Sequence, residues 1–179
     1  MNKREIIAYF DARAPEWDAR MVRSDSKIAF ILDAAGVRPG VSVLDVACGT
    51  GVLFGDYLAR DAARVTGVDI SPEMARIAVS KLRDPRVEVL CGDVEELPLP
   101  RRYDCCVVYN AFPHFAHPAR LLARLSACLS PSGRLTVAHG MSLAALHRHH
   151  AGLWLHGRAD GGQIQPPVCI KRYLGVAYA

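Results

Sequence analysis

The stretch Val43-Leu44-Asp45-Val46-Ala47-Cys48-Gly49-Thr50-Gly51 decides how the rest of the chain is interpreted. It begins as an apolar run typical of a buried strand, and it ends in a turn with two glycines. A helix is predicted to begin at about Val52. Glycines allow a backbone to take positive φ and to approach a ligand closely, and the free N–H groups of a helix start attract an anionic group. The stretch therefore predicts a strand, a tight turn and a helix that form one wall of a ligand site.

The alternation of strands and helices continues through the middle of the chain. Apolar runs of strand length lie at 41–46, 64–68, 86–90, 103–109 and 134–138, and helix-like segments lie at 52–60, 72–81 and 118–129. Strands rich in Val, Leu, Ile and Cys with helices between them predict a parallel sheet covered on both faces. We expect a doubly wound α/β sheet of about five parallel strands.

A single domain is expected, since 179 residues match one average domain. Residues 1–36 are predicted to form a helical segment, with a break near Pro15 and a second helix from Ser24 to Gly36. Residues 37–140 form the α/β core. Residues 141–179 are an atypical tail rich in His, Gly and Pro, in which only 172–179 suits a short strand.

Composition and charge exclude several classes of function. The net charge of +4 is spread along the chain without a basic run longer than a pair, so nucleic acid is not an expected partner. No apolar stretch approaches the roughly 18–20 residues of a membrane span, and the first residues lead into no signal peptide. The six cysteines form no CxxC pair and lie mostly in apolar runs, which predicts reduced, buried thiols and a cytoplasmic location.

Two acidic residues follow the next two predicted strands. Asp69 ends the second strand, about 20 residues beyond the glycine turn, where a carboxylate can accept hydrogen bonds from both ribose hydroxyls. Asp93 follows the third strand, where a carboxylate can meet the exocyclic amine of an adenine, with Val94 against the ring. Ser71 and Pro72 suit the N-cap and first position of a helix, so Asp69 by itself is also compatible with a purely structural role.

Taken in order, these motifs resemble the class I S-adenosylmethionine-dependent methyltransferases, most closely the ubiquinone/menaquinone-biosynthesis-like (methyltransferase type 11) group. The similar segments are VLDVACGTG at 43–51, VTGVDIS at 65–71, CGDVEELP at 91–98 and LSPSGRLTVAH at 129–139. The segment YFDARAPEWD at 9–18 resembles the helix that closes over the cofactor, a helical lid. The resemblance covers about residues 5–150. It implies that family's Rossmann-like fold, here with the C-terminal antiparallel pair missing or reduced.

The resemblance implies S-adenosyl-L-methionine as the cofactor and S-adenosyl-L-homocysteine as the product. Two histidines, His114 and His139, are candidate bases by their positions after the fourth strand and at the end of the fifth, although both suit a pocket-shaping role equally. A base is needed only if the acceptor must lose a proton. The implied cofactor-binding residues are Asp45, Ala47, Gly49, Gly51, Asp69, Ile70, Met74, Asp93, Val94 and Asn110, and the implied lid or acceptor residues are Tyr9, Trp17, Phe112 and Phe115.

Three functions remain open from the sequence. The first is methyl transfer to a small-molecule acceptor by in-line displacement, in which the protein mainly aligns and desolvates the reactants. The second is a nicotinamide-dependent oxidoreductase, which Phe54 disfavours because the fingerprint G-x-G-x-x-G requires glycine there. The third, suggested by the altered tail, is a non-catalytic or weakly active cofactor-binding module.

Two smaller expectations concern the tail. If the fifth strand is an edge of the sheet, we expect the tail or a second copy of the chain to cover it, the latter giving a homodimer. The histidines of the segment 147–150 have no carboxylate or thiolate at ligand-like spacing, so no metal site is expected.

Overall fold

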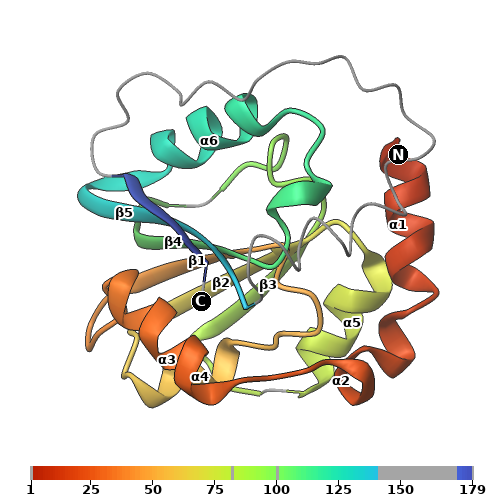
Figure 1. Ribbon diagram of the computed structural model, residues 1–179, viewed down its shortest axis with the longest axis horizontal. Coiled ribbons are helices and arrows are strands. Elements are labelled where there is room, and N and C mark those ends of the chain that lie inside the picture. Colours follow the sequence, from red (N-terminus) through yellow and green to blue (C-terminus); the bar gives the residue numbers. More distant parts are fainter. Residues whose placement is uncertain (1, 82, 100, 141–172, 179) are drawn as a thin grey trace.

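The computed structural model describes residues 2–81, 83–99, 101–140 and 173–178. Its strands form one sheet in the order β3-β2-β1-β4-β5-β6, and every neighbouring pair is parallel (Figure 1). The order reverses between β1 and β4, and ligands of doubly wound sheets bind at such a reversal. The strands are β1 (Ser42–Val46), β2 (Arg64–Asp69), β3 (Val87–Cys91), β4 (Tyr103–Tyr109), β5 (Leu129–His139) and β6 (Tyr173–Tyr178).

Helices cover both faces of this sheet. On one face pack α3 (Asp25–Ala34), α4 (Phe54–Ala59) and α5 (Pro72–Lys81), and on the other packs α6 (Pro118–Ala127) (Figure 1). The N-terminal segment comprises α1 (Lys3–Asp11), a 3-10 turn η1 (Ala14–Glu16) and α2 (Trp17–Arg20), and α1 and η1 contact α5. A second 3-10 turn, η2 (Phe112–His114), follows β4. The arrangement confirms the predicted Rossmann-like α/β fold.

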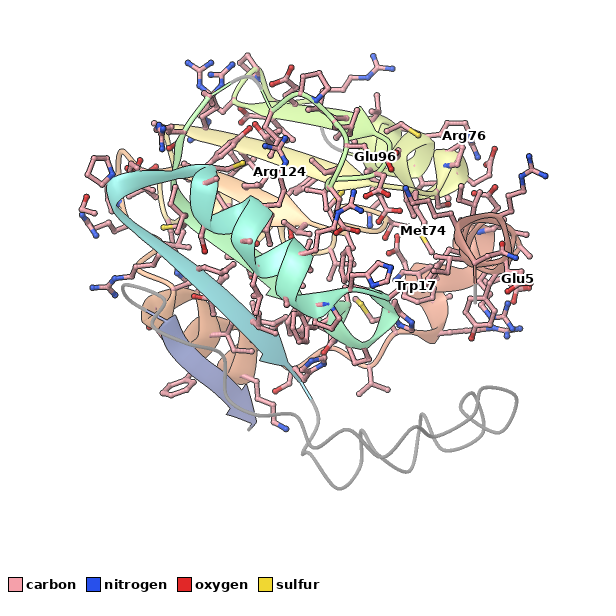
Figure 2. The ribbon with its side chains drawn as sticks, turned by 90° about the horizontal axis from the view of Figure 1, so that it is seen from above. Glu5, Trp17, Met74, Arg76, Glu96 and Arg124 are labelled. Carbon is pink, nitrogen blue, oxygen red and sulfur yellow. The ribbon has the colours of Figure 1, made fainter. Side chains whose placement is uncertain are left out.

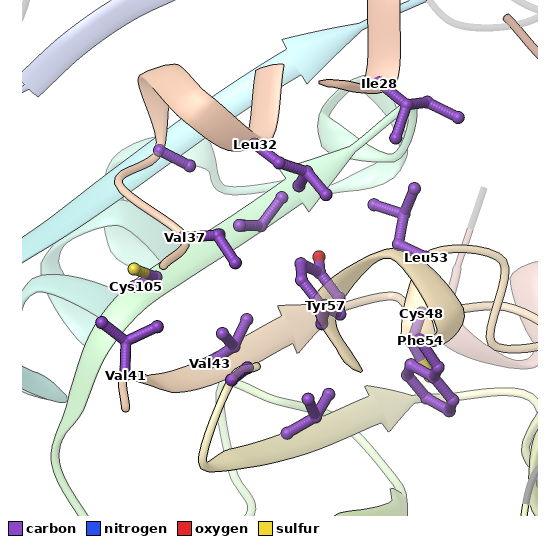
Figure 3. Packing of buried hydrophobic residues seen from close by; sticks show 14 of the residues in the cluster. Ile28, Leu32, Val37, Val41, Val43, Cys48, Leu53, Phe54, Tyr57 and Cys105 are labelled. Atoms are coloured by element: carbon purple, nitrogen blue, oxygen red, sulfur yellow. The ribbon is translucent and has the colours of Figure 1, made fainter. Parts of the chain in front are cut away.

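Alternating side chains of the central strand divide the core into two layers. Val43 of β1 belongs to one buried cluster with Tyr57 and Phe54 of α4 on one face (Figure 3). Leu44 packs on the opposite face in a cluster that includes Leu121 of α6. A strand whose two faces are both apolar is held in place from both sides, so the loop that follows β1 has a rigid base.

Two local features determine how the chain continues after β2 and after β1. The Ser71 hydroxyl accepts a hydrogen bond from the Met74 N–H at 3.2 Å, and Pro72 occupies the first position of α5, as expected of a capped helix start. After β1 the chain makes turns in which Gly51 N–H donates to the Cys48 carbonyl at 3.0 Å. Because of these turns α4 begins at Phe54 rather than at Val52 as predicted.

The fifth strand differs from the expectation for 134–138. It begins at Leu129, opposite Tyr103, and the next pair is Arg134 with Cys105, so the strand bulges between them. The bulge contains Pro131, whose missing N–H needs no partner there. Leu129 therefore belongs to the sheet and α6 ends at Ala127, two residues earlier than the predicted end of the helix.

The sheet also has a sixth strand, one more than the expected number of about five. The strand β6 comes from the segment 172–179 and pairs with β5, so this chain's own tail covers the edge of β5. No antiparallel pair occurs among the described strands. The rest of the tail, 141–172, lies outside the described residues, and the division into lid, core and tail stays a prediction.

Candidate functional site

A cavity of about 400 Å³ lies at the carboxyl ends of four adjacent strands, β3, β2, β1 and β4. Each of these strands contributes one polar side chain to its wall: Asp45 within β1, Asp69 at the end of β2, Asp93 after β3 and Asn110 after β4. Ligand sites of proteins have volumes of about 300–1,000 Å³. The cavity therefore has the size and position of a site for a small ligand or cofactor.

The backbone in the cavity wall and just behind it takes unusual conformations. Gly49 and Gly51 have φ of 56° and 75°, and the non-glycine residues Ala47 and Asn110 have φ of 54° and 56°. Left-handed backbone is costly for a residue with a Cβ and clusters at functional sites. A Cβ on Gly51 would come within 2.7 Å of the Phe54 ring, so this position requires glycine for a steric reason as well.

Asp69 joins the glycine turn to the start of α5. One of its carboxylate oxygens accepts the Gly49 N–H at 2.8 Å, and the other accepts the Ser71 N–H at 2.9 Å. The side chain is buried, and burial raises its pKa while these hydrogen bonds oppose the shift. Each oxygen has a second lone pair, so the carboxylate can accept further hydrogen bonds from a ligand in the same cavity.

Asp45 lies beside Asp69 and is only 2% exposed. Burial and, next, the repulsion of the Asp69 carboxylate raise the pKa of Asp45 to about 8, while the Tyr57 hydroxyl opposes the shift. The carboxyl is therefore largely protonated near neutral pH. A cation that entered the cavity would favour its ionised form.

Asp93 stands at the mouth of the cavity. Its carboxylate accepts the Glu95 N–H at 2.9 Å and pairs with the Lys3 ammonium at 2.6 Å. Lys3 also pairs with Glu96 at 2.5 Å. The start of α1 is thus tied to the loop that follows β3.

Two further contacts hold the N-terminal segment against the cavity. Asp11 at the end of α1 accepts a hydrogen bond from the Ser71 hydroxyl at 2.5 Å, beside Asp69. Asp18 of α2 accepts the Thr50 hydroxyl at 2.5 Å and pairs with Lys81 at 2.6 Å. Although burial works in the other direction, the hydrogen bonds from Lys81 and Thr50 hold the pKa of Asp18 below its usual value. These contacts place the segment against the glycine turn and the start of α5.

The cavity gathers most of the residues that the sequence singles out. The predicted residues in its lining are Asp45, Ala47, Gly49, Asp69, Ile70, Met74, Asp93, Val94, Asn110, Trp17, His114 and Phe115. Trp17 and Met74 are labelled in Figure 2, where Trp17 lies beside the N-terminal helices. The two candidate bases differ in position, because His114 lines the cavity whereas His139 is buried at the end of β5 and is not among the lining residues.

Three other predicted residues also lie outside the lining. Gly51 is in the turn just behind it, and Phe112 packs against the α6 side of the core. The Tyr9 ring lies under the Arg13 guanidinium, whose carbon is 3.5 Å from the ring centre.

Sequence reasoning missed several lining residues of the N-terminal segment. Ile6, Phe10 and Met21 line the cavity together with Lys3. The spacing of Ile6 and Phe10, four residues apart, places both on one helix face and could have pointed to them.

Sequence expectations also concern metal ligands, cysteines and membrane-spanning helices. Among the described residues, no three His, Cys, Asp or Glu side chains are grouped so as to hold a metal ion, and the histidines of 147–150 lie outside those residues. The five described cysteines are free, but Cys91 is exposed, so the expectation of burial is wrong for that residue. No helix in the described ranges is long and apolar enough to cross a membrane.

The sheet order, the glycine turn after β1 and the carboxylates of β2 and β3 define a Rossmann-like protein of the nucleoside-cofactor-binding kind. A family model described as a methyltransferase domain matches residues 43–133, and the chain belongs to this family. Together with the relatives below, the match confirms the class I S-adenosylmethionine-dependent methyltransferases of the ubiquinone/menaquinone type.

Similar proteins are methyltransferases with different named acceptors. The malonyl-[acyl-carrier protein] O-methyltransferase of Anoxybacillus flavithermus is 33% identical over 138 residues, which are 75% of this chain and 52% of the relative. The demethylmenaquinone methyltransferase of Renibacterium salmoninarum is 31% identical over 140 residues, 75% of this chain and 58% of the relative. The chain spans about half, or less, of the length of the curated relatives it matches.

A solved structure shares the fold. The magnesium protoporphyrin IX methyltransferase of Synechocystis with bound S-adenosylhomocysteine has a TM-score of 0.62 and 21% identity. The match covers 85% of this chain and 79% of that one. At this identity the likeness supports the arrangement of the sheet and helices alone.

Proposed function

We propose that the chain binds S-adenosyl-L-methionine in this cavity and transfers its methyl group to a small-molecule acceptor. The observation that carries the proposal is the charge of the described lining. It contains the carboxyl groups of Asp45, Asp69, Asp93 and Glu95 but a single lysine, Lys3. Such a cavity suits a cofactor that carries a sulfonium and an ammonium. It opposes a nicotinamide dinucleotide, whose pyrophosphate would face carboxylates.

The strand order supports a definite orientation of the cofactor. The ribose hydroxyls would donate to Asp69 and the adenine amine to Asp93, with Ile70 and Val94 against the ring. The methionine end would then lie over the turn at Gly49. In this orientation the cofactor extends from β3 across β2 to β1, and its sulfonium comes to lie between the ends of β1 and β4.

The residues beyond the sulfonium are mainly apolar. Phe115 and Trp17 line this part of the cavity, together with His114. When the cofactor is bound it supplies an already activated methyl group, so the protein's part is to align the acceptor and exclude water. We assign the role of base, where the acceptor requires one, to His114 rather than to His139, since only His114 lines the cavity.

The surroundings of the reaction follow from the same proposal. We propose a cytoplasmic enzyme without a nucleic-acid partner, built from a lid at 1–36, a core at 37–140 and a tail at 141–179. Because β6 covers β5, a homodimer would have to form through the C-terminal tail. Light scattering of the purified chain across a concentration series measures that association directly.

Calorimetry and turnover together test the proposed function. We expect S-adenosylmethionine and S-adenosylhomocysteine to bind with measurable heat and NADH to give none. Production of S-adenosylhomocysteine is then followed with a panel of phenolic, carboxylic and enolic acceptors. Absence of binding by both adenosyl ligands would refute the site. Binding without turnover on every acceptor would instead support the non-catalytic module.

A further inference from the structure

Three aromatic rings from two distant parts of the chain meet over the cavity. The Phe10 ring of α1 contacts Trp17 edge-to-face, with 5.7 Å between ring centroids. It also contacts His114 edge-to-face, with 5.2 Å between centroids. All three residues line the cavity, and Figure 2 shows Trp17 beside the N-terminal helices. Phe10 therefore bridges the lid and the loop after β4.

These rings stand over one end of the cavity. Trp17 lies next to the turn after β1, because its Nε1 is 3.8 Å from the position that a Cβ on Gly49 would take. His114 belongs to η2, which follows β4. The carboxylates of Asp69 and Asp93 lie at the ends of β2 and β3, on the other side of β1. The rings thus cover the place between β1 and β4 that the proposed orientation gives to the sulfonium.

The charged side chains of the described lining are engaged away from the aromatic rings. Lys3, the single lysine of the described lining, is held at the opposite end by Asp93 and Glu96. Asp69, a buried carboxylate of the lining, uses both oxygens for backbone N–H groups. An aromatic face attracts a cation that lies within about 6 Å of the ring centre. A positive group placed here would meet π electrons rather than a competing ammonium.

We propose that Phe10 and Trp17 make the cavity select the charged sulfonium of the cofactor over the neutral thioether of the product. This inference rests on the proposed function and deepens it. In the reaction the acceptor's electron pair forms the new bond to the methyl carbon, and the pair of the breaking sulfur–carbon bond returns to sulfur, which becomes neutral. The attraction to the rings is lost at that moment. The product is then held less tightly than the cofactor that replaces it.

Titration calorimetry of the full chain with S-adenosylmethionine and S-adenosylhomocysteine tests this selection. Both ligands carry the same adenosyl and amino-acid groups and differ only in the charged S-methyl sulfonium, so the ratio of their affinities reports the contribution of that group. We expect Trp17→Leu and Phe10→Leu each to lower this ratio by about threefold to tenfold, the range of a partly exposed cation–π contact. Trp17→Phe and Phe10→Tyr, which keep an aromatic face, should retain most of it.

Val94→Ala is the matched control, because Val94 lines the cavity on the adenine side. It should weaken both ligands by the same factor and leave the ratio unchanged. A leucine variant that weakens both ligands equally would show that the rings only pack, and would overturn the inference. Wild-type protein that binds neither ligand would instead refute the proposed function. Urea unfolding of each variant checks folding. If a leucine variant is unfolded, Trp17→Met and Phe10→Met replace it as apolar side chains without a ring: a lowered ratio supports the inference and an unchanged ratio overturns it.

Discussion

Replacing Asp45 by Asn tests whether a buried carboxyl of the cavity is protonated in the folded chain. In the folded protein its pKa is raised to about 8, first by burial and then by the Asp69 carboxylate. In the unfolded chain an aspartate titrates near 3.9. Between these values the folded state keeps a proton that the unfolded state releases, so the contribution of Asp45 to stability is complete below about pH 4 and is lost as the pH rises towards 8. Asparagine has nearly the same shape and does not titrate.

The size of the effect follows from linkage. When the folded state binds one proton more than the unfolded state, the free energy of unfolding falls by about 1.4 kcal/mol per pH unit. Over the two units from pH 5 to pH 7 the full effect is about 2.7 kcal/mol. Relaxation of the buried site reduces this value, so we expect Asp45→Asn to gain about 1–2.5 kcal/mol relative to wild type over that interval. Above about pH 9 the difference should become constant.

Urea unfolding of both proteins at pH 5, 6, 7 and 8 measures this difference. Groups that do not interact with Asp45 titrate alike in both proteins, so they cancel when the two free energies are subtracted. Parallel curves for wild type and Asp45→Asn would refute the protonated carboxyl. A second readout is calorimetry of S-adenosylmethionine binding in buffers of different ionisation enthalpy at pH 7. Wild type should release protons on binding, and Asp45→Asn should not.

Three further predictions follow from single contacts. Asp69→Asn should weaken both adenosyl ligands by about tenfold, and lower the urea midpoint, since an amide offers one acceptor oxygen where the carboxylate serves both Gly49 and Ser71; an unchanged affinity would place the ribose elsewhere. Gly67→Ala should cost about 1–3 kcal/mol of unfolding free energy because a Cβ there would lie 2.5 Å from the Phe54 ring; Gly55→Ala, which meets nothing within 4 Å in α4, is the control and should be neutral or stabilising. Lys3→Ala should speed chymotryptic cleavage within α1, because the ion pairs with Asp93 and Glu96 are lost; equal cleavage rates would show that other contacts hold the lid.

The parts of the fold that sequence predicts well are those with local causes. Strand β4 and helix α5 begin and end at the predicted residues, since the helix starts with a capping Ser71 followed by Pro72. The predicted end of α6 was wrong because Leu129 continues the helical spacing of Leu121 and Leu125. Pairing of Leu129 with Tyr103 in the sheet overrides that spacing. The bulge that contains Pro131 depends on pairing with β4, so neighbouring residues in the sequence do not predict it.

The candidate site shows the same division between local and distant causes. The glycine turn and Asp69 follow from motifs within a few residues, and the structure brings both to one cavity. The lid contacts of Lys3 with Asp93 and of Phe10 with His114 join segments far apart in the chain. The raised pKa of Asp45 likewise depends on burial and on Asp69 in the neighbouring strand. Neither kind of contact leaves a pattern in the sequence.

The anchors of the proposed lid explain why its position should depend on the cofactor. Lys3 is bound to the loop after β3, Asp11 to Ser71 after β2, and Asp18 to Thr50 after β1. Each of these three loops is also one to which the proposed orientation assigns a part of the cofactor. An adenine amine that donates a hydrogen bond to Asp93 competes with Lys3 for the same carboxylate. The contacts of Asp11 and Asp18, in contrast, leave the Asp69 carboxylate and the Gly49 turn accessible. Binding should therefore loosen the start of α1 and leave its end in place, which keeps Phe10 and Trp17 over the sulfonium.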